Sequence, residues 1–361
     1  MSNLKETKVL AINLPAFHQV PENDEWWGEG FTEWDNVKSG KKLFKHHYQP
    51  REPYMGYYDL SKKEDIENQM RTAAEYGVHG FIYYHYWFGN GRMIFEKPLE
   101  IIKNEIDFDF NYCFCWANET WITTWHGLPS RTLLEQKYDG KADWEKHLEY
   151  LMPFFKDNRY IKVDNKPMMY IYKPNEIPDY DQMVDFFDAE LKKNGFDGIY
   201  FVEYIYTKNK DLSSDKSSAV MEFEPLYTTF FDISKFNLAK RFICKKLKIV
   251  DYQSYKKLWK YKLKRTRRYN GKNIQKSCFV DWDNSSRKGK DSMIVKGATT
   301  DLFKKYLHEL VKQDRADCDN EFLVINAWNE WSEGAYLEPD KKFKYGYLEA
   351  IKSLTQKGEN G

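Results

Sequence analysis

The stretch Phe322-Leu-Val-Ile-Asn-Ala-Trp-Asn-Glu-Trp-Ser-Glu-Gly-Ala-Tyr336 joins a short apolar run to two glutamates that lie among aromatic residues. The run 322–325 predicts a buried strand, and Glu330 and Glu333 follow it three residues apart, before a sharp turn that Gly334 permits. Carboxyl groups beside large aromatic rings suit sugar chemistry, because the rings offer apolar platforms to sugar faces. Burial beside such rings also raises the pKa of a carboxyl, so that it can donate a proton near neutral pH. The alternative is a surface turn with solvated acids, which is a common use of short acidic segments.

Other short apolar runs alternate with helical patterns along the whole chain. Eight runs predict strands, at residues 9–14, 80–88, 111–119, 167–172, 198–203, 219–224, 277–283 and 322–325. Helical patterns are found at residues 62–76, 95–105, 143–156, 181–194, 299–314 and 341–356, and in a basic region through the 230s to 260s. This alternation predicts an α/β protein with a (β/α)8 fold, the TIM barrel, as a single domain over residues 1–361. A doubly wound open sheet is the competing architecture.

Polar residues lie at or just beyond the ends of the predicted strands. They are His85, Asn118, Glu119, Glu203, Glu222, Glu224, Asp281, Asp283, Asn329, Glu330 and Glu333. In a barrel these strand ends meet at one mouth, which is the usual active face. In an open sheet they would be spread along an edge, and few would share a site. We therefore expect the barrel, with a site at its mouth.

Two segments are longer than the barrel pattern requires. The first, Pro21 to Asp59, is rich in Trp, Gly, Pro and Tyr and is too long to be only a connector, so we expect it to have a function. The second, Lys235 to Lys276, has 16 Lys or Arg and one acid, a net charge of +15 in a chain of net charge +1. It predicts a basic helical insertion that is either solvated, or in peripheral contact with an anionic membrane, or a holder of a lipid-diphosphate-linked glycan. No motif supports nucleic-acid binding, so we expect no nucleic acid as partner.

Composition narrows the class of protein. The 361 residues are 42% hydrophobic and 17% aromatic, which allows a sizeable core and suits a carbohydrate groove or a protein interface. No apolar run reaches membrane-spanning length, and the polar start does not read as a signal sequence. The five cysteines lack zinc-like spacing, which predicts reduced thiols in a cytoplasmic protein. Peripheral contact with the inner membrane is compatible with this location.

We expect neither a metal nor a cofactor. Asp281-Trp-Asp283 resembles the Asp-x-Asp metal motif of nucleotide-sugar glycosyltransferases, but Asp107-Phe-Asp109 matches that short motif equally well. A glycine-rich phosphate loop after a strand is missing from the sequence, which disfavours a doubly wound nucleotide-sugar transferase.

Several longer motifs carry a family resemblance. The segment Asn329-Glu-Trp-Ser-Glu-Gly-Ala-Tyr-Leu-Glu-Pro339 resembles the catalytic segment of glycoside hydrolase family 99, the endo-α-mannosidase family. The motifs that begin at Pro21, Gly30, His47, Tyr83, Trp116, Asp281 and Asn326 are together similar to the related WbsX family, over roughly residues 9–350. WbsX-like proteins belong to bacterial surface-polysaccharide biosynthesis, of O-antigen, lipopolysaccharide or capsule, and are often described as glycosyltransferases.

The resemblance implies roles for the two glutamates. Glu330 is expected to act as a base on the sugar 2-hydroxyl, giving a 1,2-anhydro intermediate with retention, and Glu333 as general acid/base on the leaving oxygen. Ser332 stands where the hydrolases usually carry His, which leaves the substrate subsite and hydrolytic competence open. Retaining enzymes with a carboxylate nucleophile hold their carboxyls about 5–5.5 Å apart and inverting ones about 6.5–9.5 Å, and a loop pair three residues apart permits either distance.

Further residues are candidates for binding the sugar. They are Glu33, Tyr84, His85, Trp87, Trp116, Asn118, Glu119, Trp121, Glu203, Glu222, Glu224, Asp281, Asp283, Asn329, Trp331 and Tyr336. For the aromatic residues the alternative is core packing, for any single acid it is a salt bridge, and for His85 it is a satisfied histidine of the barrel. Glu119 is expected to be functional, because an unpaired acid inside a barrel mouth is costly.

These features predict a carbohydrate-active enzyme that cleaves or transfers at a glycosidic bond of a surface-polysaccharide glycan or its lipid-linked intermediate. One alternative is a glycosyltransferase that uses an activated sugar donor. Another is a barrel that binds glycans without catalysis.

Overall fold

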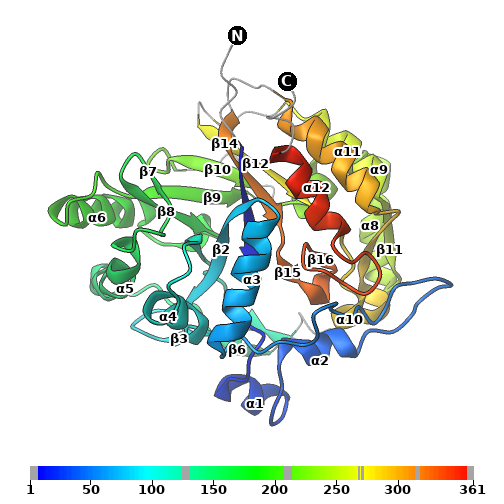
Figure 1. The fold of residues 1–361 in the computed structure, drawn as a ribbon, viewed down its shortest axis with the longest axis horizontal. Coiled ribbons are helices and arrows are strands. Elements are labelled where there is room, and N and C mark those ends of the chain that lie inside the picture. The colour runs from blue at the N-terminus through cyan, green and yellow to red at the C-terminus, as the bar shows by residue number, and fades with distance from the viewer. Residues whose placement is uncertain are drawn as a thin grey trace.

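The computed structural model describes residues 7–123, 131–205, 214–266, 269, 272–313 and 318–355. Its centre is a closed barrel of eight parallel strands (Figure 1). These are β1 (Lys8–Asn13), β2 (Val78–Trp87), β4 (Asn111–Trp116), β8 (Lys166–Ile171), β9 (Tyr200–Ile205), β10 (Ala219–Glu222), β12 (Asn273–Phe279) and β14 (Cys318–Asn326). Each pairs with the next, and β14 pairs with β1 to close the ring. The predicted (β/α)8 barrel is confirmed, and the doubly wound sheet is excluded.

Helices surround the barrel, between successive strands (Figure 1). They are α3 (Lys63–Glu75), α4 (Lys97–Asn104), α5 (Lys141–Phe155), α6 (Tyr180–Lys193), α7 (Leu226–Phe231), α8 (Lys235–Leu247), α9 (Tyr255–Leu263), α11 (Thr300–Val311) and α12 (Gly346–Thr355). Helical spacing of apolar residues sets the buried face, as in α3, where Ile66, Met70 and Ala73 are buried. The last residue of the helix predicted at 299–314 lies outside the described residues.

Several barrel strands begin earlier than predicted, and β12 and β14 each begin four residues earlier. The apolar run suggested a strand from residue 277, but β12 starts at Asn273 and ends at Phe279. Its polar first residues pair with β10, and the Gln275 side chain is buried in the barrel, where it accepts a 2.6 Å hydrogen bond from the Tyr170 hydroxyl. A search for apolar runs misses such residues, because a buried polar side chain with a partner fills a barrel as well as an apolar one.

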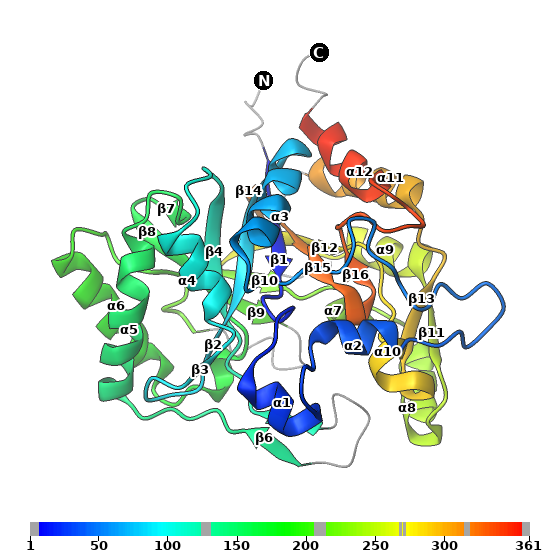
Figure 2. The same cartoon turned by 60° about the horizontal axis from the view of Figure 1, so that its bottom comes forward.

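The loops that follow the strands gather at one end of the barrel. Figure 2 shows α1 (Pro21–Trp27), α2 (Glu33–Lys38), α10 (Ser285–Lys288) and β6 (Thr132–Leu134) at this end. β6 pairs with β5 (Trp121–Ile122), and β15 (Asn329–Glu330) pairs with β16 (Ala335–Tyr336). The remaining short strands are β3 (Met93–Ile94), β7 (Lys162–Val163), and the parallel pair β11 (Asp251–Ser254) and β13 (Met293–Lys296).

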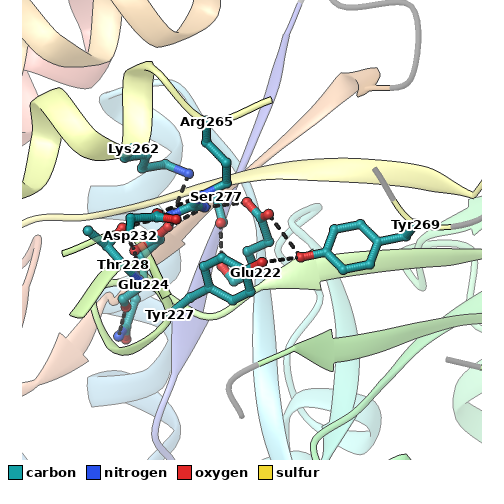
Figure 3. A network of polar contacts seen from close by, with 10 residues as sticks. Glu222, Glu224, Tyr227, Thr228, Asp232, Lys262, Arg265, Tyr269 and Ser277 are labelled. Atoms are coloured by element: carbon teal, nitrogen blue, oxygen red, sulfur yellow. Dashed lines mark hydrogen bonds and ion pairs between the residues drawn. The ribbon is translucent and has the colours of Figure 1, made fainter. Parts of the chain in front are cut away.

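The basic segment from Lys235 to Lys276 is composite. It contains α8, β11, α9 and the first half of the barrel strand β12. After α9, Arg265 lies between the carboxylates of Glu222, Glu224 and Asp232, in a buried network (Figure 3). Part of the positive charge of this segment therefore neutralises acids on the outer face of the barrel. No helix in the described parts of the chain is long and apolar enough to cross a membrane.

Candidate active site

The chain after β14 folds back as a hairpin that carries both glutamates. Glu330 pairs with Ala335 across the hairpin, and the turn between them includes a 3-10 helix, Trp331–Glu333. Gly334 then adopts a φ of +64°. A Cβ atom at this position would lie 2.9 Å from Nη2 of Arg51 and 3.0 Å from Cβ of Asp283. Both the backbone conformation and the close packing therefore require glycine.

Buried hydrogen bonds fix the hairpin on the barrel. The Asn329 side chain accepts from the Leu14 amide at 2.7 Å and donates to the Leu14 carbonyl at 3.0 Å, which ties the hairpin to the end of β1. The Trp331 indole stacks on Tyr336, with 3.9 Å between ring centroids, and donates to Glu338 at 2.6 Å. These three predicted sugar-binding residues, Asn329, Trp331 and Tyr336, hold the hairpin and line neither hollow described next.

Two hollows meet at Glu330 and Glu333. The first has a volume of about 340 Å³, and the second, of about 140 Å³, lies beneath the long first loop. The first has an aromatic wall that consists of Tyr84, Tyr86, Trp121, Tyr172, Phe223 and Trp282. The second is lined by residues that include Asn23, Trp27, Phe31, Glu33 and Phe95. Tyr86, Trp121 and Arg287 line both hollows together with the two glutamates. The pair thus lies where the two spaces join.

Burial and charge set the protonation of the pair. Burial raises the pKa of Glu330 well above its usual range, and the charge of Glu333 raises it further, while Arg287 opposes both effects. Burial also raises the pKa of Glu333, against the lowering effect of Arg287, whose Nη1 lies 3.6 Å from the Glu333 carboxylate. The Glu333 side chain keeps 24% of its surface exposed. Two interacting carboxyls of this kind can share one proton, which leaves one as acid and the other as base.

A third acid holds the arginine in place. Glu33 of α2 accepts two hydrogen bonds from Arg287, one of them from Nε at 3.0 Å, and a further one from Asn36 at 3.0 Å. Because Glu33 belongs to the long first loop, this loop takes part in building the site, as its length and composition predicted.

Three of the predicted sugar-binding residues, Tyr84, Glu119 and Trp121, line the first hollow. Tyr84 projects inward from β2, and Glu119 follows β4 at the mouth. The sequence suggested that Glu119 is unpaired. This is wrong, because Nζ of Lys173 lies 2.8 Å from its carboxylate. Burial raises the pKa of Glu119, and the Lys173 hydrogen bond and charge lower it.

Three predicted residues instead point outward, against α5. His85 lies with its Nε2 2.9 Å from Nε2 of His147, and burial lowers the pKa of His85 to about 3. The Trp87 indole donates to Asp143 at 3.0 Å, and the Trp116 indole donates to the Trp87 carbonyl at 2.8 Å. Side chains alternate between the two faces of a strand, so the residues that flank Tyr84 and Tyr86 face the helices. This corrects the expectation that all polar residues at strand ends face the mouth.

The remaining predicted residues are also bound within the protein, away from both hollows. Glu203 accepts from the Ser217 hydroxyl and from the Ser214 amide, and Glu224 lies 2.7 Å from Nη1 of Arg265 (Figure 3). The Asn118 side chain exchanges two hydrogen bonds with the backbone of Lys173.

The two aspartates after β12 support the first loop. Asp281 accepts from Arg51 at 2.9 Å, and Asp283 accepts from Gln49 at 2.9 Å and contacts Nε2 of His47 at 2.8 Å. Both aspartates face away from the cavity, while Trp282 between them lines it. Among the described residues, no three His, Cys, Asp or Glu side chains converge as a metal site would require.

Several residues of the cavity were missed in the sequence. They are Tyr86, Tyr172, Phe223, Trp282, Asn284, Arg287 and Lys288 in the first hollow. The alternation of side chains could have identified two of them. Tyr86 lies two residues from the inward Tyr84, and Trp282 lies between the outward Asp281 and Asp283. Arg287 had no such signal, because its position depends on how α10 packs on α2.

The chain is similar to proteins of known families. The family described as "Glycosyltransferase WbsX" matches residues 9–351. The "Uncharacterized protein WxcX" of Xanthomonas campestris pv. campestris (strain ATCC 33913) is 30% identical over 351 residues, which cover 95% of this chain and 49% of the relative. The corresponding protein of strain B100 gives the same identity and coverage. The chain thus spans about half the length of the curated relatives it matches.

Solved structures share the fold at low identity. The GH99 endo-alpha-mannosidase from Bacteroides thetaiotaomicron, in complex with bis-tris-propane, matches with a TM-score of 0.56 and 12% identity, over 98% of this chain and 97% of that one. A structure described as a "Glycoside hydrolase-like protein" matches with a TM-score of 0.59 and 12% identity, over 97% and 94% of the two chains. These structures share the barrel fold with this chain. Because the family model matches residues 9–351, the chain belongs to the family described as "Glycosyltransferase WbsX".

Proposed function

We propose that the protein is a carbohydrate-active enzyme that acts on a glycosidic bond, with Glu330 and Glu333 as the catalytic pair. The observation that carries this proposal is the position of the two buried carboxyls between two hollows with aromatic walls. A sugar in each hollow brings the bond between them to the carboxyls. Aromatic rings such as Tyr172 and Trp27 then provide apolar platforms for the sugar faces.

The roles within the pair follow from the family resemblance. Glu330 removes the proton of the sugar 2-hydroxyl, whose oxygen attacks the anomeric carbon, and Glu333 gives its proton to the leaving oxygen. In the free protein the deeper burial of Glu330 favours the shared proton there. These roles therefore require the proton to pass to Glu333 when the substrate binds. Arg287 does not favour protonation of Glu333, because it lies 3.6 Å from that carboxylate and its charge lowers the pKa of both carboxyls, so the bound substrate must drive the transfer.

The proposed substrate is a glycan of bacterial surface-polysaccharide biosynthesis, such as an O-antigen, lipopolysaccharide or capsule repeat, in free or lipid-linked form. We propose a cytoplasmic location, which is supported by the free thiols of the four buried cysteines Cys113, Cys115, Cys244 and Cys278. Transfer from an activated sugar donor is the second candidate reaction, and the description of the matched family as a glycosyltransferase favours it. A barrel that only binds glycans is the third.

Product analysis tests the proposal. The protein is incubated with manno- and rhamno-configured oligosaccharides, with and without a sugar acceptor and with nucleotide sugars, and the products are identified by mass spectrometry. We expect turnover that Glu330→Gln or Glu333→Gln lowers by about 10²-fold or more, because general acid–base catalysis contributes about 10²–10⁴-fold. Glu309→Gln, at a half-exposed side chain of α11, is the matched control and should have no effect.

The products separate the candidates. Cleavage without an acceptor supports hydrolysis, a new linkage formed from an oligosaccharide donor supports transglycosylation, and a product formed only with a nucleotide sugar supports the glycosyltransferase. Binding of glycan by calorimetry without any turnover, unchanged in Glu330→Gln, would leave only the glycan-binding barrel.

A further inference from the structure

Helix α8 exposes an unusual number of large apolar side chains. Of nine exposed large hydrophobic residues in the described parts of the chain, six lie between Phe230 and Ile249. Phe236 is 80% exposed, Ile243 57% and Leu247 61%. These three are spaced at i, i+7 and i+11, so they lie along one face of the helix. Contiguous exposed apolar surface of this kind marks an interaction site.

The same helix carries positive charge and no negative charge. Residues 235–249 include six Lys or Arg and no acid. The five lysines are exposed: Lys235, Lys240, Lys245, Lys246 and Lys248. Arg241 has a different task, because it lies 3.1 Å from Asp251 and donates to the Thr229 carbonyl at 2.8 Å, which fixes the helix to the body of the protein.

In the rest of the basic segment, some charges face the barrel, while Lys256, Lys257, Lys260 and Lys264 are exposed. Arg265 binds three acids, and Lys262 lies 3.4 Å from Glu224. Lys276 donates to the Gln313 carbonyl at 2.6 Å. Of the nine exposed lysines among the described residues of the segment, five thus lie on α8 or at its end, beside the apolar face. An apolar face with flanking lysines complements an anionic lipid surface, into which such a helix inserts its apolar side while the lysines meet the headgroups.

A third hollow connects α8 with the candidate active site. It has a volume of about 320 Å³ and lies between α8, α7 and β13. Phe230, Leu238, Phe242 and Ile249 give it an apolar side, and Lys245 and Lys288 a positive one. It shares Leu226, Trp282, Asn284 and Lys288 with the first hollow. The exposed helix therefore borders a hollow that adjoins the one lined by Glu330 and Glu333.

We propose that α8 docks the protein on an anionic lipid bilayer, with Phe236, Ile243 and Leu247 inserted among the headgroups. Docking of this kind would bring the candidate active site close to a glycan that is carried on a lipid of the same bilayer. This second part rests on the proposed function, whereas docking itself does not require catalysis.

Vesicle co-sedimentation of the full chain tests the docking. We expect binding to vesicles of phosphatidylcholine mixed with phosphatidylglycerol, little binding to phosphatidylcholine alone, and a loss of binding as salt is raised. Phe236→Ser with Ile243→Ser and Leu247→Ser, and separately Lys245→Gln with Lys246→Gln and Lys248→Gln, should each lower the bound fraction by about tenfold.

Matched controls come from other surfaces of the protein. Met55→Ser removes an apolar side chain that is 68% exposed, and Lys192→Gln with Lys193→Gln removes two exposed lysines of α6. The controls should bind as the wild type does, and unchanged thermal unfolding should show that the α8 variants are folded. Absence of binding at low salt, equal binding to neutral vesicles, or equal loss in the controls overturns the proposal. The proposal is also overturned if the protein does not bind vesicles and instead forms a dimer in solution that the α8 apolar variant dissociates.

The failure of docking and the failure of the enzymatic proposal are distinguishable. Glu330→Gln should bind vesicles as the wild type does, whatever its activity. The α8 variants should process a free oligosaccharide at the wild-type rate, but a lipid-linked glycan in vesicles more slowly. Equal rates of the wild type and the α8 variants on the vesicle-borne substrate would refute the link between docking and the processing of a lipid-linked glycan.

Discussion

Arg287 connects the candidate catalytic pair with the long first loop. It binds Glu33 and lies 3.6 Å from Glu333, and its charge lowers the pKa of both glutamates of the pair, against the effect of burial. A neutral residue at this position would leave burial unopposed. The pH dependence of activity should therefore depend on this one side chain.

Arg287→Gln should move the pH profile of kcat/KM to higher pH. Both carboxyls then keep their protons to higher pH, so the limb that needs an ionised base and the limb that needs a protonated acid shift in the same direction. The measurement is kcat/KM against pH with a glycan substrate from the product screen. Arg287→Lys keeps the charge without the planar fork and should shift the profile less. A profile in Arg287→Gln that coincides with that of the wild type would contradict this account.

Gly334 shows how backbone and packing constrain the same residue. Gly334→Ala should destabilise the protein by about 1–3 kcal/mol, because φ is +64° and the new Cβ would crowd Arg51 and Asp283. The measurement is the midpoint of thermal or denaturant unfolding. Gly195→Ala is the control, since Gly195 has a φ of +87° but nothing within 4 Å of its Cβ position, so it reports the backbone cost alone. Equal losses in both variants would mean that packing around Gly334 adds nothing.

Single residues of the site could be predicted only in part. Glu330, Glu333, Tyr84 and Glu119 line the cavity, and all four belong to motifs that stand out in the sequence. Asp281-Trp-Asp283 stood out as well, but its acids face away from the cavity and its tryptophan faces it. Sequence identifies the segment of the chain that reaches the mouth, while the phase of the strand decides which side chain enters it.

At the scale of elements, the segment after α9 is part of the barrel rather than an appendage. Arg265 is buried between Glu222, Glu224 and Asp232, and Lys262 adds a second positive charge near Glu224 (Figure 3). Burial raises the pKa of Glu224, but Arg265 and Lys262 lower it more, to a value below its usual range. The folded protein therefore favours ionised Glu224, which stabilises the fold above the unfolded pKa of this group and less as pH falls through the folded pKa.

Arg265→Met should destabilise the fold by about 3–5 kcal/mol at neutral pH, because it leaves buried carboxylates without their partner. The loss should be smaller in acid, where those carboxyls take up protons. Unfolding midpoints at pH 7 and pH 4 measure both effects. Arg92→Met is the control, since it breaks a pair between Glu22 and a half-exposed arginine, and should cost about 1 kcal/mol or less at either pH. A loss in Arg265→Met that does not depend on pH would argue against charge as its cause.

The strands of the barrel could be predicted because most of them are apolar runs. Where the barrel uses polar residues, as at Gln275 in β12, the run is interrupted and the predicted boundary moves. The basic segment was harder, because its charge pattern looks uniform, although Arg265 faces buried acids and the lysines of α8 face outward. That division depends on tertiary packing, which net charge does not encode.

At the scale of the whole molecule, the two hollows come from different parts of the chain. The wall of the first is built mainly from the ends of barrel strands, and much of the second from the long first loop. The barrel thus provides one side of the site and its largest insertion the other. A glycan that spans the catalytic pair would contact both parts, and shortening it at one end would remove contacts with only one of them.

This division predicts opposite responses of two variants to trimmed substrates. Trp27→Ala removes a half-buried ring of the second hollow, and Tyr172→Ala a half-buried ring of the first. Each should weaken transition-state binding of a full-length oligosaccharide by about 0.5–1.5 kcal/mol, the size of a ring contact, which is measured as a fall in kcat/KM. When the oligosaccharide is shortened at its reducing end, one of the two variants should have the same kcat/KM as the wild type, because the missing sugar had made the contact. When it is shortened at its non-reducing end, the other variant should have the same kcat/KM as the wild type. If both variants lose their effect with the same trimmed substrate, the sugar chain does not cross the pair from one hollow to the other.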